Sequence, residues 1–295
     1  MIKRVAALND LSGLGRCSLT AAIPVLAALG AEACPVPTAV LTGQTGFPGF
    51  YMDDYTQKID QYINHWSKLD LHFDGIYTGF LANAAQADKI YDFLNVFKKD
   101  DTLLLIDPVM GDNGRIYPPF TQVLCEKLKT LSLEADVITP NLTEACILAG
   151  KDYNEFTSHA GDFLYLEKVT ELGLEIINRA NHPYTAIITG INHKSADDDT
   201  EYIYNAAITG DKVYFSKTKP YGCGYSGTGD IFASVICGYL IQGRPLEAAV
   251  SKAAEFIEAA AFDACLAGTD RNYGINFEKY LYMLINDTRK EDPFK

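Results

Sequence analysis

Short apolar runs rich in β-branched residues alternate with longer stretches of helical periodicity along most of the chain. The apolar runs predict buried strands, and these are Arg4–Leu8, Cys34–Leu41, Gly75–Thr78, Leu103–Ile106, Val137–Thr139 and Ala186–Thr189. The stretches between them predict helices, and these are Leu19–Leu29, Asp53–Trp66, Gln86–Phe97, Phe120–Leu131 and Glu167–Arg179. Such alternation is typical of βαβ units, in which helices cover both faces of a parallel sheet. The sequence therefore predicts a doubly wound α/β fold.

The pattern changes after the sixth predicted strand. Glu201–Thr209 and Lys212–Lys217 predict two strands joined at Gly210 and Asp211, because a Gly-Asp pair between two such runs favours a hairpin. The sheet is therefore expected to be mixed at one edge. Two further helices are predicted at Thr228–Ile241 and Leu246–Ala264. No internal repeat or linker interrupts the pattern, so residues 1–295 are expected to form a single domain.

Charge narrows the class of partner. The chain has 295 residues, 48% of them hydrophobic, with 25 basic and 38 acidic side chains and a formal net charge of −13. These values are typical of a folded globular protein and exclude a disordered chain. A strongly acidic surface repels phosphate backbones and anionic lipid, so nucleic acid and membrane partners are not expected. The favoured partner is a small molecule.

The cysteines indicate a compartment. Seven are scattered through the chain without a CxxC pair, a pattern that favours reduced, mostly buried thiols. The apolar run Val5–Leu8 stops at Asn9 and is too short for a signal peptide, and no apolar run approaches the roughly 20 residues that span a bilayer. We expect a cytoplasmic protein.

Polar residues recur just after the predicted strands. In open parallel sheets, ligands bind where the carboxyl ends of the strands meet the loops. The residues at these positions are Asn9, Asp10, Ser12, Thr42–Thr45, Thr78, Gly79, Asp107, Asp112, Thr139, Asn141, Glu144 and Thr189. Their recurrence on one predicted edge indicates a ligand site there.

The densest chemical signal is the glycine-rich segment Gly222–Asp230, which directly precedes an apolar helical stretch. Its glycines permit tight turns, and a helix that begins at such a turn offers free N–H groups and a positive dipole end to an anion, with phosphate the expected occupant. Asp230 has two interpretations: it caps the helix, or it serves as a base beside the bound phosphate.

Other motifs were weighed against this one. Residues 222–227 match GxGxxG, with Glu247 about 20 residues beyond as a dinucleotide fingerprint requires. However, Glu247 follows Pro245 at the start of a predicted helix, whereas the fingerprint acid ends a strand. An oxidoreductase is therefore not favoured. The sequence contains no P-loop motif, no HExxH and no GxSxG.

Three blocks together resemble the ribokinase superfamily, and within it the pyridoxal (vitamin B6) kinase branch. They are Asp107-Pro108-Val109-Met110-Gly111-Asp112, Thr139-Pro140-Asn141-Leu142-Thr143-Glu144 and Gly227-Thr228-Gly229-Asp230. Asn9–Arg16, Thr42–Phe47 and Thr78-Gly79-Phe80 extend the likeness over nearly the whole chain. The resemblance implies a ribokinase-like three-layer fold, a homodimer, and ATP-dependent phosphorylation of the 5′-hydroxyl of a B6 vitamer in salvage.

The resemblance also implies roles for single residues. Asp230 would accept the proton of the hydroxyl, and the backbone of Gly227, Thr228 and Gly229 would form an anion hole. Asn141, Glu144, Thr189 and Thr228 would lie at the nucleotide. Mg²⁺ would be held through Asp107 and Glu144, with Asp112 nearby. Alternatively, Glu144 is a first-turn helix residue and Asp107 a strand-end cap. A monovalent cation such as K⁺ near Thr189 stays open.

For the vitamer, the branch implies contacts at Asp10 or Ser12, at Thr45 and at Phe80. Here the chain departs from the better-known pyridoxal kinases, which carry serine at the position of Asp10 and tyrosine at that of Phe80. A carboxylate at Asp10 could pair with a protonated ring nitrogen or an amine, so we hypothesise that pyridoxamine or pyridoxine rivals pyridoxal.

Three alternatives remain beside this interpretation. Hydroxymethylpyrimidine kinases share the opening Asp10-Leu11-Ser12-Gly13 and a glutamine like Gln44, but usually carry cysteine where this chain has Asp230. A sugar or nucleoside kinase is disfavoured because those families have a different N-terminal motif. A non-catalytic vitamer-binding protein is disfavoured because the glycine-rich segment is intact through Asp230.

Cys223 has two interpretations. It is an exposed thiol that reacts with an aldehyde, or a small packing residue in a loop, and the second is favoured.

Overall fold

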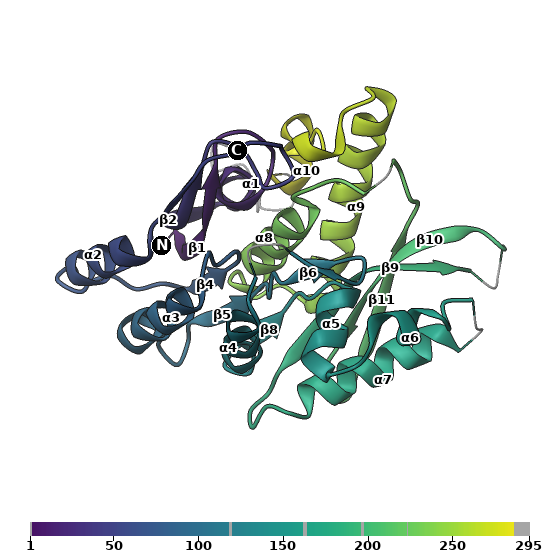
Figure 1. The fold of residues 1–295 in the computed structure, drawn as a ribbon, viewed down its shortest axis with the longest axis horizontal. Coiled ribbons are helices and arrows are strands. Elements are labelled where there is room, and N and C mark those ends of the chain that lie inside the picture. Colours follow the sequence, from purple (N-terminus) through teal and green to yellow (C-terminus); the bar gives the residue numbers. More distant parts are fainter. Residues whose placement is uncertain (1, 118–119, 162–163, 196–197, 223, 286–295) are drawn as a thin grey trace, which may run out of the picture.

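The computed structural model describes residues 2–117, 120–161, 164–195, 198–222 and 224–285. Within them one sheet has nine strands in the order β11-β10-β9-β8-β5-β4-β1-β2-β3. The strands are β1 (Lys3–Ser12), β2 (Ala31–Leu41), β3 (Met52–Asp54), β4 (Gly75–Thr78), β5 (Leu103–Ile106), β8 (Val137–Ile138), β9 (Thr185–Lys194), β10 (Glu201–Ile208) and β11 (Val213–Thr218). The pairs from β9 through β2 are parallel, which confirms the expected α/β architecture (Figure 1).

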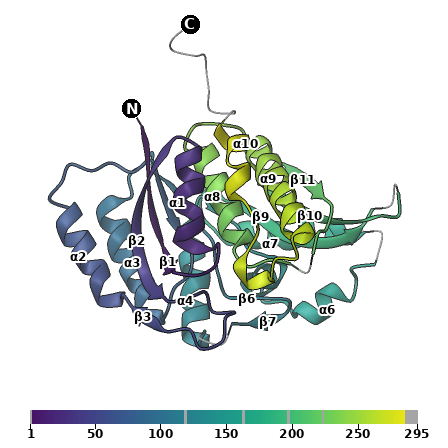
Figure 2. The ribbon, with the colours of Figure 1, turned by 90° about the horizontal axis from the view of Figure 1, so that it is seen from above.

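Helices cover both faces of the sheet (Figures 1 and 2). One face packs on α1 (Ser18–Ala28), α8 (Thr228–Leu240) and α9 (Leu246–Leu266), with α10 (Tyr282–Ile285) beside them. The other packs on α2 (Thr56–Trp66), α3 (Ala84–Phe97), α4 (Gln122–Ser132), α5 (Leu142–Ala149), α6 (Tyr153–Thr157) and α7 (Tyr165–Ile177). Since side chains alternate across a strand, Val5 and Ala7 of β1 join the first core, and Ala6 and Leu8 the second. The three-layer prediction is confirmed.

Both edges of the sheet are antiparallel, so the expectation of one mixed edge was incomplete. The β10–β11 hairpin forms the predicted edge. At the other edge β3 pairs antiparallel with β2, in a region predicted as the start of a helix at Asp53. The helix begins only at Thr56, because Asp54 Oδ1 accepts hydrogen bonds from the Thr56 backbone N–H and hydroxyl.

The first strand is longer than predicted. β1 runs to Ser12, so Asn9, Asp10 and Ser12 are strand residues rather than loop residues. Its last residues pair with β2, up to Ser12 opposite Leu41, whereas its pairing with β4 stops at Leu8 opposite Thr78. The end of β1 therefore projects past β4 on one side. The remaining predicted elements shift at their ends by small amounts, except β9, which continues to Lys194.

A small hairpin escaped prediction. β6 (Gly111–Asp112) and β7 (Arg115–Ile116) pair antiparallel, with Asn113 and Gly114 at φ of 50° and 74° between them. Positive φ at both central residues, occupied by Asn-Gly, is the signature of a tight hairpin turn. A Cβ on Gly111 would lie 2.3 Å from Arg115 O, which explains the glycine there.

Of the seven cysteines, the structure describes six, and all six are free thiols, four of them buried. This agrees with the expectation of reduced, mostly buried thiols. Cys223 lies outside the described residues. In the described ranges, no helix combines the length and apolarity needed to cross a lipid bilayer.

Candidate active site

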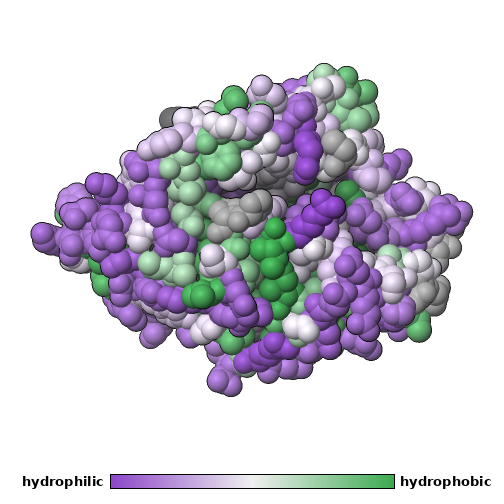
Figure 3. Space-filling view, in the orientation of Figure 1, coloured by the Kyte–Doolittle hydropathy of each residue, from purple (hydrophilic) through white to green (hydrophobic). Residues whose placement is uncertain are grey.

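The polar residues predicted at the strand ends meet along the carboxyl edge of the sheet. The strand order places the ends of β1, β4, β5 and β8 side by side, and Thr189 in the middle of β9 lies next to the end of β8. Two contacts close the group: Asn9 reaches Asp230 at the start of α8, and Asn141 bridges to Thr189 of β9. The face of the molecule drawn in Figure 1 is hollowed near its centre (Figure 3).

The glycine-rich segment turns directly into α8. Gly227 has φ of 80°, and a Cβ there would lie 2.0 Å from Arg16 O, so only glycine fits. No side chain caps the helix. In the described chain, the N–H groups of Gly227, Thr228 and Gly229 have no backbone acceptor outside the helix. These N–H groups and the positive end of the helix dipole are the features for which the sequence predicts an anion.

Asp230 does not cap this helix. Its Oδ1 accepts a hydrogen bond from Asn9 Nδ2 at 2.9 Å and a longer one from the Tyr77 hydroxyl at 3.4 Å. Burial raises the pKa of Asp230, against hydrogen bonds from the Ser18 backbone, Asn9 and Tyr77. A carboxylate of raised pKa beside an open anion site is suited to act as a general base.

Asn9 and Tyr77 were missing from the predicted site residues. The sequence predicts Asn9 only as a polar residue at a strand end, and Tyr77 only as part of a buried strand. The signal in the sequence is a polar residue in or directly after a predicted buried strand. Both side chains are fully buried in the structure, and buried polar groups need partners. The sequence alone does not reveal which partners they have.

Asp107 is buried at the end of β5. Its carboxylate faces the start of α8, because a Cβ on Gly229 would lie 3.8 Å from Asp107 Oδ2. Burial, followed by the charges of Glu144 and Asp230, raises the pKa of Asp107 well above its usual range. The buried hydroxyl of the neighbouring Thr139 acts against this rise, although its distance and angle to the carboxylate do not make a regular hydrogen bond. Such groups are costly unless a ligand completes them.

Glu144 has the first-turn helix position that was one of its two interpretations. It forms a capping box with Asn141, in which Glu144 Oε2 accepts from Asn141 N at 2.9 Å. Its Oε1 accepts from Met110 N at 2.9 Å, which ties α5 to the loop after β5. Burial raises the pKa of Glu144 to about 8, against these backbone hydrogen bonds. Its oxygens are therefore oriented toward the protein backbone.

Asp112 belongs to the β6–β7 hairpin. Its two carboxylate oxygens accept from Asn113 N and Asn113 Nδ2, each at 2.9 Å. It lies close enough to Glu144 to raise that residue's pKa. The structure thus gives Asp112 a turn-forming role and places it beside the predicted metal ligands.

The donor set fits a divalent cation that phosphate also coordinates. No ion pair among the described residues involves Asp10, Asp107, Glu144 or Asp230. The described residues contain no group of three His, Cys, Asp or Glu side chains that could hold a metal ion unaided. Since Mg²⁺ usually keeps waters and binds one or two carboxylates with substrate phosphates, the residues present suit it.

Three of the predicted nucleotide residues, Asn141, Glu144 and Thr189, lie together, whereas Thr228 lies on another element. Asn141 and Thr189 form a parallel bridge, and Thr189 N donates to Pro140 O at 2.9 Å. Asn141 Nδ2 donates to Gly111 O at 2.7 Å, which holds the β6–β7 hairpin over the start of α5. Thr228, on α8, donates its hydroxyl to Tyr225 O at 3.2 Å.

The predicted vitamer residues are only partly brought together. Ser12 Oγ donates to Asp10 Oδ2 at 2.8 Å, and both side chains are buried. Burial and the nearby Asp230 raise the pKa of Asp10 to about 6, against hydrogen bonds from Ser18 and Ser12. Phe80 is half-buried, and its N–H donates to Asn9 Oδ1 at 2.8 Å. Thr45 is exposed in the loop after β2.

That loop is held by a segment from the far end of the chain. Gln44 Nε2 donates to Asn272 O at 3.1 Å, and its Oε1 accepts from Gly46 N at 2.7 Å. The Phe47 and Tyr273 rings pack edge to face at 5.0 Å. The oxygen and the nitrogen of the Gln44 side chain are therefore both hydrogen-bonded within the protein, at the position of the substrate-loop glutamine that hydroxymethylpyrimidine kinases share.

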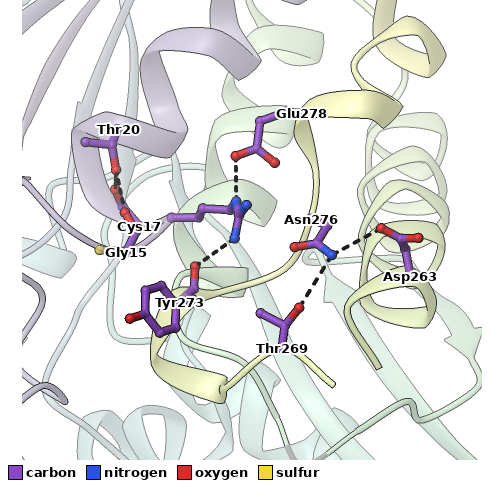
Figure 4. A network of polar contacts seen from close by, with 9 residues as sticks. Gly15, Cys17, Thr20, Asp263, Thr269, Tyr273, Asn276 and Glu278 are labelled. Atoms are coloured by element: carbon purple, nitrogen blue, oxygen red, sulfur yellow. Dashed lines mark hydrogen bonds and ion pairs between the residues drawn. The ribbon is translucent and has the colours of Figure 1, made fainter. Parts of the chain in front are cut away.

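The same segment, Asp270–Gly274, also holds the loops on the α8 side. Ser226 N donates to Arg271 O at 3.0 Å, and Arg16 N to Tyr273 O at 3.1 Å. The guanidinium of Arg16 donates to Glu278 Oε1 at 2.5 Å and to Tyr273 O at 3.3 Å (Figure 4). One C-terminal segment thus joins the loops after β1 and β2 to the glycine-rich turn.

Comparison with known proteins agrees with the fold described above. The profile of the phosphomethylpyrimidine kinase family matches residues 15–274. A Bacteroides thetaiotaomicron protein assigned to the phosphomethylpyrimidine kinases, solved in a crystal form with pyridoxal, superposes with a TM-score of 0.87. It is 36% identical, and the match covers 96% of each chain. The pyridoxal kinase of Lactobacillus plantarum superposes with a TM-score of 0.83 at 28% identity, covering 97% of this chain and 98% of that one.

A curated relative agrees over a shorter stretch. The pyridoxal kinase PdxY of Rubrobacter xylanophilus is 31% identical over 160 residues, which are 53% of this chain and 50% of that protein. The chain spans about half the length of the first curated relatives it matches. The resemblance to the pyridoxal kinase branch of the ribokinase superfamily is confirmed.

Proposed function

The chain belongs to the phosphomethylpyrimidine kinase family, and from that premise we propose that it transfers phosphate from ATP to the 5′-hydroxyl of a vitamin B6 vitamer. The observation that carries this proposal is the Asp230 carboxylate, held by Asn9 at 2.9 Å beside the uncapped start of α8. A base and an anion site next to each other are what phosphoryl transfer to an alcohol requires.

Each residue has a task in this scheme. Asp230 accepts the proton of the attacking hydroxyl, and its raised pKa makes it a stronger base than an ordinary carboxylate. The N–H groups of Gly227, Thr228 and Gly229 bind the transferred phosphoryl group. Asp107 would hold Mg²⁺, and Glu144, whose oxygens accept from backbone N–H groups, would hold it through bound water. When bound with ATP, this ion would neutralise charge on the phosphates. Asn141 and Thr189 line the nucleotide. A K⁺ ion would lie beside Thr189, and measuring activity with K⁺ replaced by a larger monovalent cation tests this.

Asp10 would set the preference among vitamers. Its buried carboxylate has no ion-pair partner among the described residues, so a cationic group of the substrate would stabilise its charged form. We propose that Asp10 pairs with a protonated ring nitrogen or amine, with Ser12, Phe80 and Thr45 as further vitamer contacts. Equal changes in kcat/KM for all three vitamers in Asp10→Ser would contradict this pairing.

Hydroxymethylpyrimidine phosphorylation is the second candidate, because the family's name and the Bacteroides relative's assignment refer to a pyrimidine. Two features of this chain favour the B6 vitamer. Asp230 stands where hydroxymethylpyrimidine kinases usually carry cysteine. The side chain of Gln44 is hydrogen-bonded within the protein, to Gly46 N and Asn272 O.

The deciding experiment is ADP release by the purified protein with Mg-ATP and one of four acceptors: pyridoxal, pyridoxamine, pyridoxine or hydroxymethylpyrimidine. Turnover on the B6 vitamers that vanishes in Asp230→Asn is the expected result. Turnover on the pyrimidine alone would replace the proposed substrate. Binding of a vitamer without any turnover would leave a vitamer-binding protein of the same fold.

The setting of this activity is part of the proposal. We propose a single kinase domain, a homodimer and a cytoplasmic location. The free state of the six described cysteines supports a reducing compartment. Sedimentation in solution tests the dimer, and fractionation of cells tests the location.

A further inference from the structure

Asn9 lies at the centre of the site and makes four hydrogen bonds. It is fully buried near the end of β1. Its Oδ1 accepts from Phe80 N at 2.8 Å and from Asp10 N at 2.9 Å. Its Nδ2 donates to Asp230 Oδ1 at 2.9 Å and lies 3.5 Å from the Tyr77 hydroxyl. One side chain thus joins β1, the loop after β4 and the start of α8.

These partners fix the orientation of the amide. Phe80 N and Asp10 N are backbone donors, so the atom that faces them must be the amide oxygen. The NH₂ group is therefore directed at Asp230 and cannot exchange places with the oxygen without losing two hydrogen bonds. Asn9 can only donate to Asp230, which favours the charged form of that carboxylate.

Gly79 makes room for this arrangement. A Cβ on Gly79 would lie 2.4 Å from Asn9 Nδ2, closer than any side chain allows. The Thr78-Gly79-Phe80 motif thereby acquires a physical reason: glycine admits the amide, and the next residue supplies an N–H that holds it.

Resting on the proposed function, we propose that Asn9 is a positioning residue for the phosphoryl transfer. It holds the Asp230 carboxylate at the anion site and couples its position to the Phe80 backbone, next to the vitamer. Binding of the vitamer against Phe80 would thereby fix the base as well as the substrate.

The test compares Asn9→Asp with a matched control. Asn9→Asp keeps an oxygen for Phe80 N and Asp10 N but removes the donor to Asp230. Gln86→Glu is the control: the Gln86 side chain is also fully buried, its oxygen accepts from Ala82 N at 2.8 Å, and its nitrogen donates to a carboxylate, that of Asp54, at 3.2 Å. No hydrogen bond among the described residues joins Gln86 to Asp230 or Asn9.

The expected result is a loss in kcat rather than in ATP affinity. Misplacing a reacting group by about 1 Å costs about 100-fold, so kcat of Asn9→Asp should fall about 100-fold while KM for ATP changes less than about twofold. Gln86→Glu should retain kcat. Gly79→Ala, which displaces the amide without changing Asn9, should show a loss similar to that of Asn9→Asp. Wild-type kcat in folded Asn9→Asp, or equal losses in Asn9→Asp and Gln86→Glu, would overturn the proposal.

A second readout needs no turnover. The pKa of Asp230, followed by carboxyl carbon NMR, should rise in Asn9→Asp, since a like charge replaces a donor. The other titratable groups near Asp230 are Asp10 on β1, Cys17 before α1, Tyr77 on β4, Asp107 after β5 and Tyr117 after β7. They are the same in Gln86→Glu, which should leave the pKa of Asp230 unchanged. An unshifted pKa of Asp230 in Asn9→Asp rejects the contact, whereas an inactive wild type with a shifted pKa rejects only the proposed function.

Discussion

Gly229 faces the carboxylate of Asp107 across the start of α8, such that a methyl group on Gly229 would lie 3.8 Å from Asp107 Oδ2. Gly227 and Gly229, two positions apart in the chain, are therefore glycine for different reasons. Gly227 is required by its backbone, with φ of 80° and no room for a Cβ beside Arg16 O. Gly229 has room for a methyl group in the protein itself.

This difference predicts opposite outcomes for two alanine variants. Gly229→Ala should fold normally, because its Cβ meets only an ordinary contact, but it should lose phosphoryl transfer by placing a methyl group in the proposed anion site. Gly227→Ala should lower the free energy of unfolding by more than the about 1–3 kcal/mol that backbone strain costs, because its Cβ would also clash with Arg16 O. Denaturant unfolding and ADP release separate the two. Gly229→Ala with normal turnover would remove the anion site from this turn.

Asp230→Asn should nearly abolish turnover and spare ATP binding. General bases contribute about 10²–10⁴-fold to the rate, and the amide cannot accept the proton of the hydroxyl. Because Asp230 does not cap α8, the variant should keep the folding stability of the wild type within about 1 kcal/mol. Calorimetric ATP binding and ADP release check this. Near-normal turnover would show that another group is the base.

Asp10 should make stability depend on pH. Its native pKa of about 6 lies above its ordinary value of 3.8, so the native state binds this proton more tightly than the unfolded state. The stabilisation is complete below pH 3.8 and is lost as pH rises to about 6. In Asp10→Asn that loss is absent, and at pH 7 the variant should gain on the order of 3 kcal/mol in free energy of unfolding relative to the wild type.

Urea unfolding at pH 4 and pH 7 measures the difference for both proteins. A constant difference between the two pH values would show that Asp10 does not titrate in this range. Saturation with the vitamer should reduce the pH dependence of the wild type, because a cationic group would restore the charged form of Asp10.

An aromatic cluster should account for much of the stability of the face that carries α2 and α3. Phe93 is fully buried, and its ring lies 4.6 Å from that of Phe97 and 6.3 Å from those of Phe73 and Trp66. Phe93→Ala should cost about 3–5 kcal/mol in unfolding free energy. Val123→Ala, at a residue 60% exposed, should cost less than about 0.5 kcal/mol. Similar costs in thermal unfolding would contradict this packing.

Most elements of the fold could be predicted from the sequence because the signals are local. Burial on both faces makes β4 and β5 continuous apolar runs, and helical periodicity marks α3 and α4. The exceptions are short or depend on partners. β3 exists only because β2 is beside it, and Asp54 delays the start of α2 until Thr56.

Local sequence patterns also indicate the chemistry available at the site. They predict a glycine-rich turn before an apolar helix, with Asp10, Asp107, Glu144 and Asp230 near the ends of elements, because turn chemistry and strand ends depend on neighbouring residues. How these groups are used depends on contacts between distant parts of the chain. Asn9 and Asp230 are 221 residues apart in the chain, and their contact follows from the packing of α8 against the sheet. The direction of the Glu144 carboxylate, toward backbone N–H groups, was likewise decided by the loop that folds over α5. Local sequence patterns predict which chemical groups are present at the site. The packing of distant elements determines the distances between these groups and their burial, and their pKa values and roles depend on both.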